Sequence, residues 1–271
     1  MPSNVLNLNN LRLAVLIDAE NVPRNCIKSV MEEIAIYGTP TVKRIYGDWT
    51  NPAIAGWKAS LLENAITPIQ QYSYTVGKNS SDSAMIIDAM DILYSDKTDG
   101  FVIVSSDSDF TRLAIRLREA GQRVIGIGER KTPSAFIAAC DKFTYIEVIR
   151  ANAEEAGSEQ GEQDDSSSAQ KAQSQPREKQ HAQQRPRGVK VPKAVVQLIA
   201  DSVADLADDS GVVFMGELGN LILKKQPDFD NRNYGYKSLS AMIKSIDRFD
   251  IDFRQTTDPN IKHVFVRDKE A

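Results

Sequence analysis

Residues 101–110 have the sequence FVIVSSDSDF, in which an apolar run leads into two aspartates, Asp107 and Asp109. A short apolar run of this kind is typical of a strand buried on both faces, as in parallel sheets. A second run, residues 11–18 (LRLAVLID), ends in Asp18 in the same way. Because parallel strands present their carboxyl ends at one edge of the sheet, the sequence predicts that these acids share a crevice.

The chain from residue 11 to residue 149 alternates between strand-like and helix-like patterns. Further predicted strands are residues 41–46, 67–72, 123–127 and 145–149. The predicted helices are residues 21–37, a segment opened by Asn51, and residues 82–94, 110–120 and 134–139, with Asn21 as the cap of the first. This alternation predicts an α/β fold with a mainly parallel sheet between helices on both faces.

The composition limits the classes of function. The chain has 271 residues, 41% of them hydrophobic, and a formal net charge of −4. That charge excludes a surface that is positively charged over the whole protein, so any binding of nucleic acid must use a local basic patch. The two cysteines show neither zinc-binding nor disulfide spacing, and no apolar run reaches the length of a membrane span. We therefore expect a cytoplasmic protein that does not associate with membranes.

Two changes in composition divide the chain. Residues 151–188 contain mostly Glu, Gln, Ser and Ala and cannot bury enough surface to offset chain entropy, so they are predicted to be a flexible linker. This places a first domain at residues 11–150 and a second at residues 189–269. The second domain regains apolar periodicity, with predicted helices and strands at residues 195–206, 215–223, 239–246, 249–253 and 264–266. Three helices followed by a β-hairpin predict a winged-helix domain.

Four acids fall at strand or helix ends on what should be one edge of the sheet: Asp18, Asp82, Asp107 and Asp109. Crowded carboxylates are costly unless a cation lies among them. Mg²⁺ and Mn²⁺ prefer oxygen ligands, and such ions activate water and neutralise phosphate charge. Because residues 11–150 contain no histidine, the sequence favours metal-activated water over histidine-dependent cleavage. Taken singly, an acid such as Asp18 or Asp107 is explained equally by helix capping.

Other polar residues near these acids are further candidates. Asp88 lies in an apolar part of the predicted helix that begins at Asp82, which suggests a supporting role behind the metal ligands. Lys78 belongs to a Gly-led basic loop that offers a phosphate contact. Ser106 and Arg112, which flank the acidic pair, are predicted to contact substrate, although a solvated helix face also explains Arg112.

These residues together resemble the NYN domain, a branch of the PIN-like nucleases. The matching strings are IDAEN at 17–21, KNSSD at 78–82 and SSDSDF at 105–110. The resemblance implies a PIN-like α/β/α sandwich and cleavage of RNA that depends on Mg²⁺ or Mn²⁺. It also implies that the four acids hold the metal and that Asn21 lies in the substrate cleft.

The C-terminal segment between Gly216 and Leu239 is similar to the OST-HTH, or LOTUS, domain. That resemblance implies a winged helix that binds RNA or a protein partner such as an RNA helicase. The pairing with an NYN domain resembles limkain-like and LabA-like proteins. Candidate RNA contacts are Arg232, Tyr234, Tyr236 and Lys237, because aromatic rings beside cations suit unpaired bases and phosphates. Packing and helix capping are the alternative roles of these residues.

Three functions remain open at this point. The first is a metal-dependent ribonuclease whose C-terminal module selects RNA. The second is a phosphatase of the haloacid-dehalogenase type, because Asp107–Thr111 fits its DxDxT motif with Asp107 as nucleophile, although that family carries the motif on its first strand. The third is a non-catalytic RNA-binding or scaffold protein.

Overall fold

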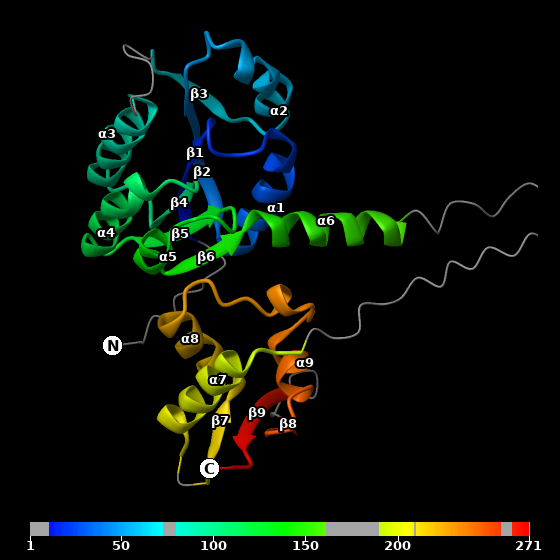
Figure 1. Ribbon diagram of the computed structural model, residues 1–271. Coiled ribbons are helices and arrows are strands. Elements are labelled where there is room, and N and C mark those ends of the chain that lie inside the picture. The colour runs from blue at the N-terminus through cyan, green and yellow to red at the C-terminus, as the bar shows by residue number, and fades with distance from the viewer. Residues whose placement is uncertain (1–10, 73–79, 161–189, 209, 256–261, 271) are drawn as a thin grey trace, which may run out of the picture. The chain divides into compact units, whose positions relative to one another are not determined.

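The computed structural model describes residues 11–72, 80–160, 190–208, 210–255 and 262–270. The chain divides into two compact units, with the main boundary at Arg150. The elements of the first unit, with 3₁₀ helices labelled η, are β1 (Arg12–Asp18), η2 (Arg24–Cys26), α1 (Ile27–Tyr37), β2 (Thr39–Gly47), η3 (Pro52–Trp57), α2 (Lys58–Glu63), β3 (Thr67–Gln70), α3 (Ser80–Tyr94), β4 (Gly100–Val104), η4 (Ser108–Phe110), α4 (Thr111–Glu119), β5 (Arg123–Gly128), α5 (Ser134–Ala139), β6 (Lys142–Tyr145) and α6 (Ile146–Gln160) (Figure 1).

The first unit is built on a six-stranded sheet with the strand order β3-β2-β1-β4-β5-β6, in which every neighbouring pair is parallel (Figure 1). The order reverses between β1 and β4, because β2 and β3 extend to one side of β1 and the later strands to the other. In such sheets the crevice at the carboxyl ends of the strands beside this reversal is where ligands bind. The predicted α/β fold with a parallel sheet is confirmed.

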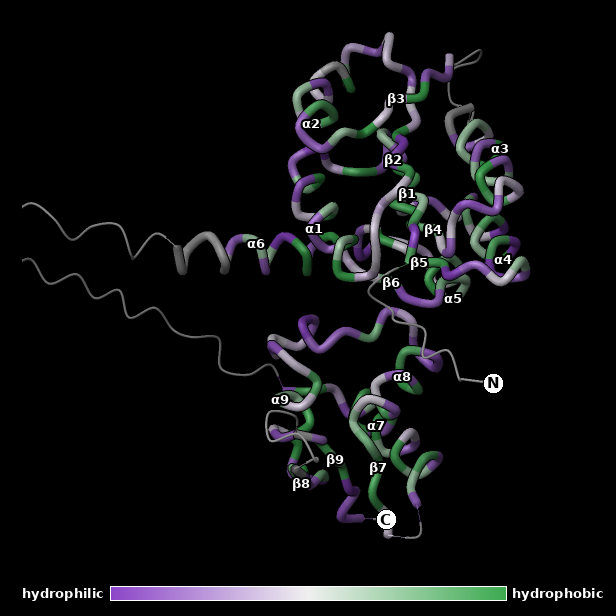
Figure 2. Tube along the Cα trace, turned by 180° about the vertical axis from the view of Figure 1, so that it is seen from behind, coloured by the Kyte–Doolittle hydropathy of each residue, from purple (hydrophilic) through white to green (hydrophobic). Residues whose placement is uncertain are grey.

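Side chains of β1 alternate between two hydrophobic cores, one on each face of the sheet. Val15 and Ile17 pack in the core that includes α1, η3 and α2, whereas Ala14 and Leu16 pack in the core of α3, α4 and α5. Hydrophobic residues accordingly recur along the central strands (Figure 2). Helices therefore cover both faces, which confirms the predicted α/β/α sandwich.

The prediction of a last strand at residues 145–149 is wrong. The final strand β6 ends at Tyr145, opposite Gly128 at the end of β5, so the backbone from Ile146 onward has no partner strand. Ile146 and Ile149 are instead one helical turn apart and both buried, as expected for the packed face of a helix.

The helix α6 continues to Gln160. The first ten residues of the predicted linker, 151–160, are therefore helical rather than irregular. The remaining linker residues, 161–188, lie outside the described part of the chain.

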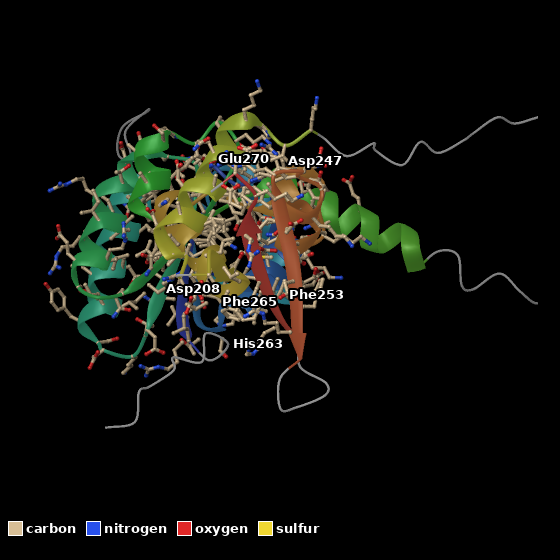
Figure 3. The ribbon with its side chains drawn as sticks, turned by 90° about the horizontal axis from the view of Figure 1, so that it is seen from below. Asp208, Asp247, Phe253, His263, Phe265 and Glu270 are labelled. Carbon is tan, nitrogen blue, oxygen red and sulfur yellow. The ribbon has the colours of Figure 1, made fainter. Side chains whose placement is uncertain are left out.

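The elements of the second unit are α7 (Lys193–Leu206), β7 (Val212–Phe214), α8 (Met215–Lys225), η5 (Asn231–Tyr234), α9 (Leu239–Lys244), β8 (Phe249–Gln255) and β9 (Lys262–Asp268). Its strands form an antiparallel sheet with the order β7-β9-β8, in which His263 and Phe265 lie on β9 and Phe253 on β8 (Figure 3). Three helices and a terminal hairpin confirm the predicted winged helix. The strand β7 was not predicted, because three residues are too few to show an alternating pattern.

Candidate active site

Asp18 ends β1 and is buried beneath the loop that follows it. Its Oδ1 atom accepts hydrogen bonds from the backbone N–H groups of Glu20 (3.0 Å) and Asn21 (3.3 Å). Its Oδ2 atom accepts from the side-chain amide of Asn21 (2.7 Å) and from the hydroxyl of Ser105 (2.9 Å). Four donors thus fix the orientation of this carboxylate at the carboxyl end of the central strand.

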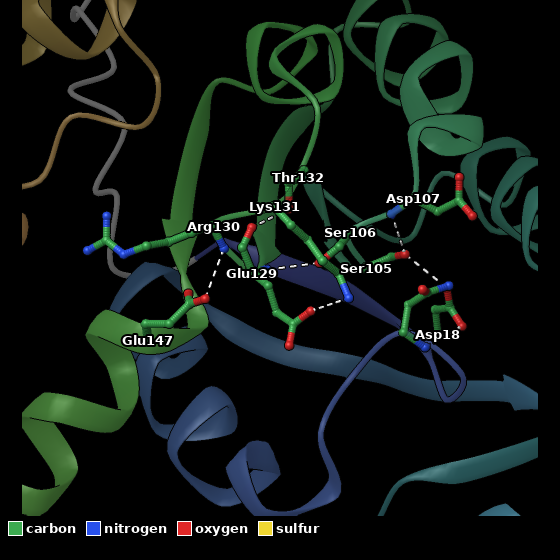
Figure 4. Close-up of polar contacts among 10 residues, drawn as sticks. Asp18, Ser105, Ser106, Asp107, Glu129, Arg130, Lys131, Thr132 and Glu147 are labelled. Carbon is green, nitrogen blue, oxygen red and sulfur yellow. Dashed lines mark hydrogen bonds and ion pairs between the residues drawn. The ribbon is translucent and has the colours of Figure 1, made fainter.

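Ser105 connects the ends of β1 and β4 (Figure 4). The pairing of these strands places Val104 opposite Ile17, which brings Ser105 beside Asp18. The fully buried Ser105 hydroxyl donates to Asp18 and accepts from the backbone N–H of Asp107 at 3.1 Å. Sequence analysis did not name this residue as a site residue, although it follows the apolar run directly and opens the matching string SSDSDF at 105–110.

Asp107 and Asp109 begin the next helical turn. Asp107 is the N-cap of η4, and its Oδ1 atom accepts a hydrogen bond from the backbone N–H of Asp109 at 2.9 Å. Asp107 is half-buried, whereas Asp109 is exposed in the first turn. Asp107 therefore performs the capping role that was one interpretation of the sequence, but capping uses only one of its two oxygens.

The buried carboxyl group of Asp82, in the first turn of α3, shows that the acids converge. Burial is the main reason that the pKa of this carboxyl is raised to about 7, and nearby carboxylates add to the rise, namely Asp18, Asp107, Asp109 and Glu20. The tertiary structure therefore brings the four predicted acids into one electrostatic cluster. Glu20 is a fifth member that sequence analysis missed, although it lies only two residues after Asp18.

The acid cluster, meaning Asp18, Glu20, Asp82, Asp107 and Asp109, fits a divalent ion in its chemistry. Carboxylate oxygens are the ligands that Mg²⁺ and Mn²⁺ prefer, and a dication would offset the repulsion that raises the pKa of Asp82. Within the described ranges, no group of three acidic, histidine or cysteine side chains lies in an arrangement that could hold a metal ion. The fit is therefore one of charge and ligand type, and not of preformed geometry.

Asp88 joins α3 to β2. Its carboxylate accepts hydrogen bonds from the guanidinium of Arg44 and the hydroxyl of Tyr46, both on β2. Burial, together with the adjacent Asp88, raises the pKa of Tyr46, which remains a neutral donor. Because Tyr46 pairs with Asp18 in the sheet, these contacts hold the helix that carries Asp82 against the strand that carries Asp18.

The other predicted site residues differ in placement. The side chain of Asn21 binds Asp18 and does not cap α1, which begins later, at Ile27, without a side-chain cap; the predicted capping by Asn21 is wrong. Ser106 is buried, and its hydroxyl accepts a hydrogen bond from the backbone N–H of Glu129, the residue after β5 (2.9 Å; Figure 4). Arg112 is exposed in the first turn of α4. Lys78 lies outside the described residues.

In the second unit, hydrogen bonds within the fold define the roles of two of the four candidate RNA contacts, Arg232 and Tyr236. The Arg232 guanidinium donates to both carboxylate oxygens of the buried Asp230 at 2.7–3.0 Å. The Tyr236 hydroxyl accepts a hydrogen bond from the serine that follows α9 (2.7 Å). Tyr234 is half-buried, and Lys237 is exposed. Arg232 and Tyr236 therefore have the packing roles that sequence analysis kept as the alternative.

The fold and the acid cluster define a nuclease-type α/β protein of the PIN-like class. Family models match an NYN domain at residues 12–147 and an OST-HTH/LOTUS domain at residues 190–261. The chain belongs to the NYN domain family and carries a C-terminal OST-HTH/LOTUS domain, which confirms both predicted resemblances.

Two solved structures are similar to parts of the chain. A protein of unknown function from Vibrio parahaemolyticus shares 20% sequence identity, with 54% of this chain and 96% of that chain covered and a TM-score of 0.44. An uncharacterized protein from Nitrosomonas europaea shares 34% identity, with 38% of this chain and 92% of that chain covered and a TM-score of 0.28. Both TM-scores are low, so the family models carry the assignment. The comparison with curated proteins found no match.

The two domains indicate a nuclease-type hydrolase with an RNA-binding module. NYN nucleases generally depend on a divalent metal ion, and OST-HTH/LOTUS domains bind RNA and mediate protein interactions. In the part of the chain that the structure describes, no helix has both the length and the apolar character needed to cross a membrane.

Proposed function

We propose that this protein is a ribonuclease that cleaves RNA phosphodiester bonds with the help of Mg²⁺ or Mn²⁺. The observation that supports this proposal best is the acid cluster, in which Asp18, Asp107 and Asp109, at strand ends beside the reversal of strand order, act electrostatically on the buried Asp82. A fold keeps such repulsion where a cation is to bind, because the ion then offsets it.

Asp18, Asp82, Asp107 and Asp109 would hold the ion. When bound, such an ion supplies a lowered pKa for its water and neutralises charge on a phosphate oxygen. Asn21 and Ser105 fix the orientation of the Asp18 carboxylate through their hydrogen bonds. These hydrogen bonds position the site, and Asn21 is also proposed to lie in the substrate cleft, as the family resemblance implies.

Cations and polar groups around the cluster would contact the substrate. Arg112 is exposed one helical turn after Asp109, where its guanidinium can meet a phosphate. Lys78, from its Gly-led basic loop, and Ser106, beside the acidic pair, are proposed as further substrate contacts. The C-terminal domain would select the RNA, with Lys237 as an exposed cation, or recruit a protein partner such as an RNA helicase.

The phosphatase alternative has less support. The DxDxT motif follows β4, the fourth strand along the chain, whereas the haloacid-dehalogenase motif is expected after the first strand. One oxygen of the would-be nucleophile Asp107 is engaged in capping η4. A search for a trapped phospho-aspartate would distinguish this chemistry from the hydrolysis that we propose.

The proposal is tested by incubating the full-length protein with labelled single-stranded and structured RNA, with Mn²⁺ or with EDTA. Asp107→Asn is the informative variant, because asparagine keeps the capping oxygen for Asp109 and removes only the charge. We expect cleavage that needs Mn²⁺ or Mg²⁺ and that falls at least about 100-fold in this variant, since removing groups even behind a metal site costs 10–100-fold.

The matched control is Asp91→Asn, an exposed aspartate on the same helix as Asp82. This variant should cleave RNA like the unaltered protein. Cleavage that survives Asp107→Asn would reveal a contaminating nuclease. If the unaltered protein cuts no RNA with either metal, the non-catalytic RNA-binding alternative replaces the proposal.

A further inference from the structure

A pocket of about 960 Å³ lies beside the acid cluster in the first unit. Its lining includes Ala19 and Glu20, the two residues that follow Asp18 at the end of β1. Glu20 also acts electrostatically on Asp82, so the pocket and the acid cluster share this residue. Its volume is at the upper end of the range of about 300–1,000 Å³ that is usual for small-molecule sites.

The pocket combines an apolar wall with a few polar groups. The nearly buried side chains of Ile54 and Trp57 form part of the wall. Asn25 and Asn51 also line it and carry side-chain amides, and Asn51 uses its carbonyl oxygen to cap η3. An apolar wall with a few amides is the kind of lining that holds a flat heterocycle and contacts its polar edge.

Arg24 is the cation among the described lining residues. It is exposed, and within the described part of the chain its guanidinium makes no hydrogen bond or ion pair. A methyl group on Gly56 would lie only 1.7 Å from the Nη1 atom of Arg24. The missing side chain at residue 56 therefore provides the space in which the guanidinium lies at the pocket.

Two carboxylates, those of Glu20 and Asp48, also line the pocket and could compete with a ligand for this guanidinium. Asp48 uses its Oδ1 atom for the backbone N–H of Thr50 (3.1 Å) and the amide of Gln70 (2.9 Å). Glu20 belongs to the acid cluster on the other side. Arg24 is thus the lining group best able to receive an anion, and a guanidinium suits phosphate geometry especially well.

We propose that this pocket binds one nucleotide of a single-stranded RNA next to the cleaved bond, with a phosphate on Arg24 and a base against Ile54 and Trp57. The inference rests on the proposed function, which places the reacting phosphate at the adjacent acids. A base must leave its stack to enter a concave pocket, so single strands are favoured over duplexes.

The test measures fluorescence anisotropy of a labelled RNA trinucleotide with the full-length protein in EDTA, where binding is separated from cleavage. Arg24→Ala should weaken binding about tenfold, the usual cost of one good charged contact. Gly56→Ala should also weaken it, because the added methyl displaces the guanidinium without removing its charge. Arg123→Ala, an exposed arginine at the amino end of β5, is the matched control and should bind normally.

Equal binding by the unaltered protein and both pocket variants would overturn the inference, as would an equal loss in Arg123→Ala, which would indicate unspecific charge attraction. A duplex of the same sequence should bind weakly and without dependence on Arg24; a duplex that binds as tightly through Arg24 contradicts the single-strand choice. If binding depends on Arg24 but no RNA is cut, the pocket stands and the ribonuclease proposal fails. If RNA is cut and Arg24→Ala binds normally, only the pocket proposal fails.

Discussion

The acid cluster of the first unit and the segment from Asp230 to Lys237 in the second are both highly charged, but the fold treats their charges in opposite ways. Around Asp82, burial and the nearby carboxylates together raise its pKa to about 7. In the second segment, Arg232 neutralises the buried Asp230 through paired hydrogen bonds. Charges that the fold pairs serve its stability, whereas charges that it leaves repelling one another indicate a place for a ligand.

The comparison predicts that removing a charge changes the free energy of unfolding in opposite directions at the two places. The largest change is expected at Asp82. In the metal-free protein at pH 8, Asp82→Asn should raise the free energy of unfolding by on the order of 4 kcal/mol, because the pKa of Asp82 is raised from 3.8 to about 7 and one pKa unit corresponds to about 1.4 kcal/mol. Both tryptophans, Trp49 and Trp57, lie in the first unit, so their fluorescence during urea unfolding in EDTA reports this change.

The pH dependence follows from the same raised pKa. Between about pH 4 and pH 7, the unfolded chain has lost the Asp82 proton that the folded protein keeps. The unaltered protein should therefore lose stability as pH rises through this window and change little above it, while Asp82→Asn should follow a flatter curve. Parallel curves for the two proteins would show that the pKa of Asp82 is not raised in the folded protein.

The next largest effect is that of the metal itself. Mn²⁺ or Mg²⁺ at about 100 times its dissociation constant should stabilise the first unit by about 2.7 kcal/mol, because an ion that binds only the folded state shifts the unfolding equilibrium. EDTA should reverse this gain, and Asp107→Asn should diminish it. An unfolding curve, followed by tryptophan fluorescence, that is unchanged by both ions and by EDTA would contradict the binding of a divalent ion at the acid cluster.

At the paired segment, Arg232→Ala should destabilise the second unit by about 2 kcal/mol, because it leaves the buried Asp230 carboxylate without its donors. Faster hydrogen exchange of the amides in α9 and β9 would report this loss. Arg267→Ala, an exposed arginine on β9, is the control and should exchange normally. Unchanged exchange in Arg232→Ala would mean that its charge is available for RNA after all.

The smallest effect is expected at Asp88, whose charge is also paired but is partly exposed. Asp88→Asn should lower the free energy of unfolding of the first unit by about 1–2 kcal/mol, since Arg44 and Tyr46 lose a charged acceptor. Tryptophan fluorescence during urea unfolding measures the change. Asp91→Asn on the same helix is exposed and should unfold like the unaltered protein. Equal stability of both variants would count against the link between α3 and β2.

Much of the first unit could be predicted because its signals are local. Apolar runs such as residues 11–18 and 101–104 form parallel strands, and the rule that ligands bind at their carboxyl ends then places Asp18 and Asp107 at one edge. The helix at Ile146 was mistaken for a strand, because a short apolar segment suits both structures until the end of its partner strand is known.

The sequence by itself determined the alternation of strands and helices up to β5, the positions of the four aspartates and the resemblance to the NYN and OST-HTH/LOTUS domains. Only the tertiary structure decided which charges meet: Glu20 joins the acids, Arg232 is bound by Asp230, and Gly56 leaves room for Arg24. The physical reason is range. Periodicity and capping act over a few residues, whereas burial and charge pairing depend on side chains that only the folded chain brings together.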